Sequence, residues 1–76
     1  MYLESLFRYL KKNYQKGTIS LTFSQIEEIM GKELCISAKM HDSYWNNPRI
    51  KRLMDKYNIR FNYINTFSRL IYFEIL

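Results

Sequence analysis

The residue types that could support catalysis gather in one short stretch, His41-Asp42-Ser43. They are the base, acid and nucleophile of a hydrolase triad, but a triad needs these groups aligned in space, and adjacency in sequence does not align them. Cys35 and His41 could both bind a metal ion, yet no second pair of such ligands exists to complete a tetrahedral site. We therefore expect no catalytic residue, no metal, no cofactor and no enzyme activity, with Cys35 as a small buried hydrophobic side chain.

Positively charged side chains form a second cluster with a chemical use. Between residues 49 and 60 there are five cations and a single anion, Asp55. Cations on a rigid face favour phosphate binding, because each neutralised phosphate releases counterions. The alternative is an ordinary solvated helix face. The predicted nucleic-acid-binding residues are Arg49, Lys51, Arg52, Lys56, Arg60 and, on a predicted hairpin, Arg69.

Three aromatic residues, Tyr44, Trp45 and Phe67, are candidates for contact with a partner. Tyr44 and Trp45 combine an apolar ring with a polar atom, which suits stacking on bases or anchoring a protein interface. Phe67 falls in a predicted turn, where an apolar side chain either folds back or contacts a partner. The alternatives are that Trp45 belongs to the core and that Phe67 is one of the isolated exposed apolar residues that proteins commonly carry.

The elements that would position these residues can be predicted from hydrophobic period and end signals. Apolar residues recur with helical spacing from Leu3 to Tyr14, and Gly17 is expected to end this first helix. Residues 18–21 alternate polar and apolar side chains, which predicts a short strand. Thr22 and Gln25 then form a capping box for a helix that ends at Gly31.

The second half of the chain begins with a short helix, for which Ser37 is the predicted cap and which ends near Trp45. Asn47 and Pro48 predict the start of a third long helix, as cap and first-turn residue. Residues 59–76 hold two strand-like runs around a turn, which predicts a β-hairpin. In its first strand we expect one face to carry Ile59, Phe61 and Tyr63.

The expected order is helix, strand, helix, helix, strand, strand, in a single domain over residues 1–76. This is the order of a winged helix, an α+β fold in which a helix-turn-helix precedes a hairpin wing. The early strand would join the hairpin, because an isolated hairpin is marginally stable.

Composition sets limits on the class of protein. Hydrophobic residues make up 47% and aromatic residues 17% of the 76 residues, which excludes intrinsic disorder. The net charge of +5 favours a polyanionic partner, and two glycines leave no room for a glycine-rich phosphate loop. The longest apolar run, at 70–73, is far too short to cross a bilayer, which takes about 20 residues. We expect a cytoplasmic protein with no membrane partner and no small-molecule substrate.

A resemblance adds to this interpretation. The stretch LTFSQIEEIMG at 21–31, then Leu34, Ser37-Ala38 and Tyr44-Trp45-x-Asn47, resembles a family of small uncharacterised bacterial and phage domains. The family pattern is LTFxxIExILG, LPxSA and WWxN, and this chain has Cys35 at the usual proline and Tyr44 at the first tryptophan. The resemblance implies a winged-helix-like fold and proximity to DNA-processing or defence systems, and no catalytic residue.

The leading prediction is a small nucleic-acid-binding or regulatory module of a phage or mobile element that uses a basic helix and a hairpin wing. The alternative is an anti-defence protein, such as an anti-CRISPR protein, that binds and inhibits a host nuclease complex. A third class, a structural or assembly role, would show self-association and neither activity.

Overall fold

The first helix and strand form in the computed structural model, which describes residues 2–76, where their hydrophobic spacing predicts them. Helix α1 (Tyr2–Asn13) buries Leu3, Leu6, Phe7 and Leu10, so its apolar face belongs to the core. The helix ends at Asn13 rather than at Gly17. Gly17 instead begins strand β1 (Gly17–Thr22) with a φ of 131°, a backbone conformation that glycine adopts without a Cβ clash.

Helix α2 (Phe23–Met30) is bounded by the two signals that the sequence predicts. The backbone N–H of Gln25 donates to Thr22 Oγ1 at 3.0 Å, and the N–H of Thr22 donates to Gln25 Oε1 at 2.8 Å. The capping box is therefore complete. Gly31 ends the helix in the left-handed conformation, with φ at 73°.

Replacing Thr22 with alanine is expected to lower the free energy of unfolding by about 1 kcal/mol, because the N–H of Gln25 loses its acceptor. Urea unfolding followed by circular dichroism measures the change. Ser24→Ala is a matched control, since its exposed side chain makes no cap hydrogen bond. Equal stability of Thr22→Ala and the parent would contradict a stabilising cap.

The segment between α2 and the next long helix contains two short helices, α3 (Ile36–Met40) and α4 (Asp42–Trp45). Cys35, not Ser37, is the N-terminal flanking residue of α3, so the predicted cap is wrong. Cys35 is also exposed, so the expectation that it is buried is wrong as well. Helix α5 (Pro48–Lys56) follows with Asn47 as its cap, as predicted.

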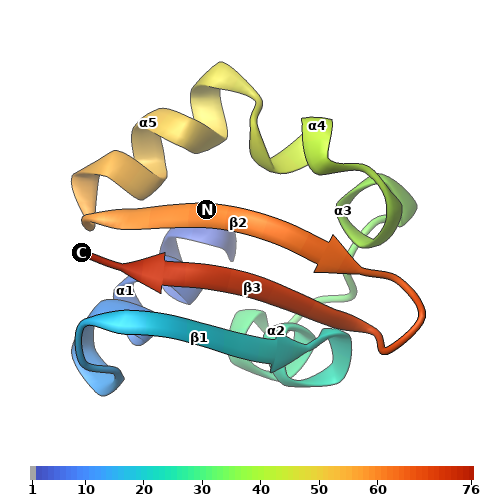
Figure 1. Cartoon of the computed structure of the whole chain (residues 1–76), viewed down its shortest axis with the longest axis horizontal. Coiled ribbons are helices and arrows are strands. Elements are labelled where there is room, and N and C mark those ends of the chain that lie inside the picture. The colour runs from blue at the N-terminus through green and yellow to red at the C-terminus, as the bar shows by residue number, and fades with distance from the viewer. Residues whose placement is uncertain (1) are drawn as a thin grey trace.

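The chain ends in a hairpin of strands β2 (Ile59–Asn65) and β3 (Leu70–Ile75). Strand β1 pairs with β3, which gives an antiparallel three-stranded sheet in the order β1-β3-β2. Figure 1 shows the sheet with α1 and α2 behind it and with α4 and α5 along the β2 side. The α+β, winged-helix-like fold and its predicted order are confirmed, with α3 and α4 as the short helical stretch.

Strand β2 departs from strict alternation at a β-bulge. Phe61 pairs with Phe73 and Tyr63 with Tyr72, so Asn62 is an extra residue on β2. An extra residue moves the following side chains to the opposite face of the sheet. Tyr63 is therefore exposed and stacks on Tyr72, with ring centroids 4.4 Å apart, and the prediction that it shares one face with Ile59 and Phe61 is wrong.

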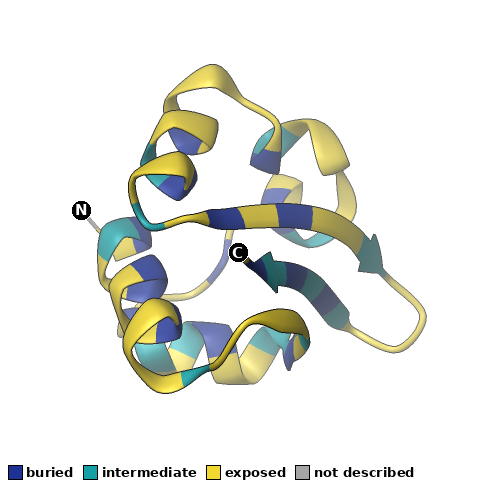
Figure 2. Cartoon of the chain, turned by 60° about the vertical axis from the view of Figure 1, so that its left-hand side comes forward, coloured by how far each residue is buried: buried dark blue, intermediate teal, exposed yellow. Residues whose placement is uncertain are grey.

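The core lies between the sheet and the helices, whose inward faces are dark blue in Figure 2. Trp45 is at its centre with no exposed surface. Its ring stacks on Phe61 at 6.0 Å between centroids and meets Phe73 edge to face at 5.4 Å, and its Nε1 donates to the Ala38 carbonyl at 2.9 Å. Trp45 as a partner contact is wrong, and the alternative of a core tryptophan holds. None of the helices within residues 2–76 is long and apolar enough to span a bilayer.

Candidate nucleic-acid interface

Helix α5 presents the predicted cations to solvent. Asn47 Oδ1 accepts from the backbone N–H of Arg49 at 2.9 Å, which fixes the first turn of the helix. The apolar side anchors it to the core, since Ile50 and Met54 are buried and Leu53 is half-buried. The exposed cations are Arg49, Lys51, Arg52 and Lys56.

The four cations lie on two flanks of α5. With about 100° of rotation per residue, Arg49, Arg52 and Lys56 share one flank, and Lys51 lies on the other. Lys51 lines a hollow of about 270 Å³ together with Asp55 and Arg60. The predicted set is therefore divided, because Lys51 and Arg60 lie beside an acid and away from the first flank.

The cations also differ in their pairing with acids. Lys56 Nζ lies 2.9 Å from Glu4 Oε2, and Arg60 lies 3.5 Å from Glu74 across the outer face of the sheet. Within residues 2–76, Arg49 and Arg52 make no ion pair, although Arg52 Nε is 3.4 Å from the Pro48 carbonyl. Arg49 and Arg52 are the cations of α5 that are free to meet phosphates on this flank.

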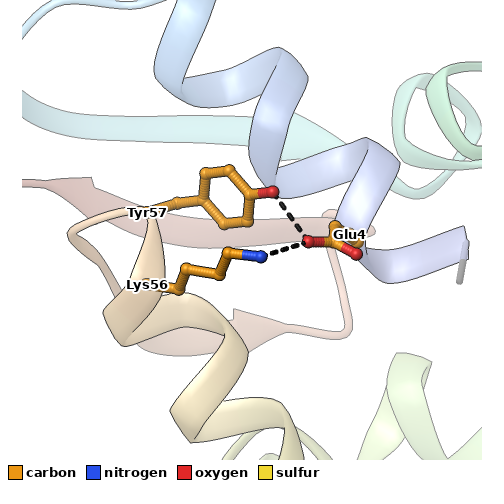
Figure 3. A network of polar contacts seen from close by, with 3 residues as sticks. All are labelled: Glu4, Lys56 and Tyr57. Atoms are coloured by element: carbon orange, nitrogen blue, oxygen red, sulfur yellow. Dashed lines mark hydrogen bonds and ion pairs between the residues drawn. The ribbon is translucent and has the colours of Figure 1, made fainter.

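Glu4 ties α1 to the end of α5 (Figure 3). One carboxylate oxygen, Oε2, accepts from Lys56 Nζ at 2.9 Å and from the Tyr57 hydroxyl at 2.8 Å. The hydrogen bond from Lys56 lowers the pKa of Glu4 below its usual 4.5, and the hydrogen bond from Tyr57 lowers it further. The same hydrogen bond to Glu4 raises the pKa of Lys56 above its usual 10.5. The carboxylate thus holds the two helices in register.

Because the pKa of Glu4 is lower in the folded chain, its contribution to stability is complete above pH 4.5 and is lost as pH falls through the folded value. We expect Glu4→Gln to be less stable than the parent near pH 7, and this difference to shrink at an acidic pH at which the Glu4 carboxyl of the folded chain is protonated. The effect is small, since the Glu4 side chain is 26% exposed and salt screens the pair. Urea midpoints at the two pH values measure it. A constant difference at both would show that Glu4 acts through packing.

Helix α1 adds cations that the sequence analysis left out. Arg8 lies one turn beyond Glu4. Its positive charge lowers the pKa of Lys56 and so opposes the rise that Glu4 causes. Lys11 follows on the same side and reaches the Leu76 carbonyl at 3.5 Å. Glu4, Arg8 and Lys11 are spaced at i, i+4 and i+7, which puts them on one flank of a helix. This spacing is the sequence signal from which the two additional cations could have been predicted. We define the α1–α5 basic face by its five cations, Arg8, Lys11, Arg49, Arg52 and Lys56.

Other predicted contact residues lie away from this face. Arg69 has a φ of 55° and lines a hollow with Lys39 of α3, so it is not joined to the cations of α5. Phe67 is fully exposed at the hairpin tip. Tyr44 is half-buried against Trp45. Burial of its hydroxyl raises the pKa of Tyr44, and the neighbouring Cys35 raises this pKa by a smaller amount. As surface contacts, Phe67 and Tyr44 stay predictions.

The residues considered for catalysis lie at the junction of two short helices. His41 ends α3, and Asp42 and Ser43 continue into α4, so the three follow one another along the backbone. Among residues 2–76, no group of three or more His, Cys, Asp or Glu side chains could hold a metal ion.

The family of the chain follows from a comparison with family models. A model described as "Domain of unknown function (DUF7662)" matches residues 3–64, which is most of the chain. The chain belongs to this family. The matched residues of this DUF7662 domain run from α1 into β2, so they include both helices of the α1–α5 basic face. No curated protein and no solved structure matches the chain.

Proposed function

We propose that this DUF7662 domain is a non-enzymatic nucleic-acid-binding module that holds the phosphate backbone of a duplex on its α1–α5 basic face. The observation that carries the proposal is the pairing pattern on this face. Arg49 and Arg52 have no acidic partner within residues 2–76, and Glu4 is the acid that lies between α1 and α5. The face therefore keeps an excess of positive charge.

The geometry of α5 suits a backbone contact. Arg49 and Lys56 are seven residues apart, which places their attachment points about 10 Å apart along the helix. Successive phosphates of a duplex strand are separated by several ångströms, so these cations can meet more than one phosphate. The helix itself is held rigidly by its buried apolar side, so little order has to be gained on binding.

The hairpin has a secondary part in this proposal. Arg60 is paired with Glu74, and Arg69 lines the hollow between α2, α3 and the hairpin tip, so neither extends the basic face. We expect the wing to modulate binding, and the helices to supply most of the affinity. Phosphate contacts position a protein on a duplex without reading its sequence, so the expected binding is weakly sequence-dependent.

Titration of a random DNA duplex with the parent protein at several salt concentrations tests the proposal. With about four phosphates neutralised, the slope of log affinity against log salt concentration is expected near −3.6, from about −0.9 per contact. Absence of salt-dependent binding even at low salt would overturn the proposal. Inhibition of a host nuclease complex, the alternative from the sequence, would then be the leading function.

A further inference from the structure

The end of the molecule formed by α3 and the hairpin tip exposes an unusual amount of apolar surface. Phe67 is 97%, Ile36 74% and Met40 59% exposed, and these are the most exposed large hydrophobic side chains within residues 2–76. Ile36 and Met40 are four residues apart on α3 and so share one side of it. Exposed apolar side chains that gather in one place mark interaction sites, whereas scattered ones do not.

The hairpin tip holds Phe67 outward on a well-ordered turn. The backbone N–H of Ser68 donates to Asn65 Oδ1 at 3.0 Å, which closes the turn from within. The backbone N–H of Phe23 donates to the Arg69 carbonyl at 3.1 Å and so fastens the tip to the start of α2. These hydrogen bonds fix the backbone on both sides of Phe67, whose side chain is exposed.

A hollow of about 720 Å³ separates the tip from α2 and α3. Phe23 and Ser24 line it from α2, Lys39 and Met40 from α3, and Thr66 and Arg69 from the tip. Figure 1 places the tip at the opposite end of the hairpin from the junction of α5 with β2. We give the name tip groove to this hollow together with two adjacent exposed side chains: Ile36, which is one turn from Met40 on α3, and Phe67, whose chain neighbours Thr66 and Ser68 line the hollow. The tip groove is therefore distinct from the α1–α5 basic face.

The charge of the tip groove is positive. Its acid, Glu27, is already engaged, because it accepts from the Leu34 N–H at 2.9 Å and pairs with Lys39 at 3.5 Å. Arg69 makes no ion pair within residues 2–76. A partner therefore needs negative charge opposite Arg69 together with apolar side chains for Phe67 and Met40.

These properties decide between the possible occupants. A second copy of the chain would bring Arg69 and a net charge of +5 against the same charges, which opposes self-association. A nucleic acid would leave the aliphatic Ile36 and Met40 without suitable contacts. We infer that the tip groove docks an acidic amphipathic helix of another protein, with its apolar side on Phe67 and Met40 and its carboxylates towards Arg69.

A display library of helical peptides of about 16 residues, selected on the full chain, tests this inference. The expected winners are acidic and carry apolar residues at i and i+3 or i+4. Phe67→Ser combined with Met40→Ser should weaken their binding about tenfold or more, as loss of central anchors does. Tyr9→Ser is the matched control, because it removes an exposed aromatic ring on α1, away from the groove.

Thermal unfolding of each variant confirms that it is folded, which is expected because the changed side chains are exposed. Three results would each overturn the inference. The first is selection of no peptide, or of peptides that are not acidic or that bind the double variant as tightly as the parent. The second is self-association of the parent that the double variant abolishes, which would assign the groove to a second copy of the chain. The third is loss of duplex binding in the double variant, which would assign the groove to nucleic acid. The inference does not depend on the proposed nucleic-acid binding, so either can fail alone.

Discussion

Changing Arg49 and Arg52 together to alanine is expected to make the slope of log affinity against log salt concentration for a DNA duplex less steep by about 1.8, because each lost phosphate contact removes about 0.9 from its magnitude. The loss of affinity should be largest at low salt, where counterion release is most favourable. Titrations of parent and variant at several salt concentrations measure both quantities. The variant should stay folded, since both side chains are exposed and lie off the apolar side of α5.

The control for this variant is Lys32→Ala combined with Lys39→Ala. It lowers the net charge by the same amount, but Lys32 follows α2 and Lys39 lies on α3, so neither change is on α1 or α5. A local phosphate site predicts a much smaller change of slope for this control. Equal losses in the two variants would show that net charge alone attracts the duplex, and would refute the assignment to α5.

Lys56 is less suitable for this test, although it lies on the same flank. Its ammonium group is bound to Glu4, so Lys56→Ala would leave that carboxylate without its nearest cation and loosen the contact between α1 and α5. A loss of binding could then come from the displaced helix. Arg49 and Arg52 have no such acidic partner, which makes their removal interpretable.

Trp45→Ala is expected to cost about 3–5 kcal/mol of unfolding free energy, the range for removing a large buried aromatic side chain. A 76-residue chain has about 4–11 kcal/mol in total, so the variant should be largely unfolded under mild denaturing conditions. Trp45 is fully buried among Phe7, Phe61 and Phe73, which would be left around a cavity. Urea unfolding followed by circular dichroism measures the loss.

Trp45→Phe separates packing from hydrogen bonding at the same position. Phenylalanine keeps much of the buried ring but leaves the Ala38 carbonyl without the indole N–H, which should cost about 1–3 kcal/mol. Tyr9→Ala, which removes an exposed ring, should change stability little. Near-parental stability of Trp45→Ala would mean that the packing around Trp45 is wrong.

Local sequence signals determined most of the secondary structure. The capping box at Thr22, the left-handed Gly31 and the Asn47-Pro48 start of α5 depend on residues within a few positions of one another, so they can be predicted without knowledge of the fold. The hairpin and the early strand followed from alternation, and the element order then limited the topology. Local signals failed where they were weak, as in the short helices α3 and α4, which have no side-chain cap.

The tertiary structure alone decided which predicted site residues share a surface. Glu4 and Lys56 are 52 residues apart, and they meet because α1 and α5 pack side by side. The same packing brings the charge of Arg8 close to Lys56 at the end of α5. The bulge at Asn62 places Tyr63 on the outer face of the sheet. Rings from α1 and from the hairpin strands pack around Trp45 and bury it. Burial and charge pairing depend on contacts between segments that are distant in sequence. Residue type and hydrophobic period could therefore identify these side chains as candidates but could not predict where they lie in the fold.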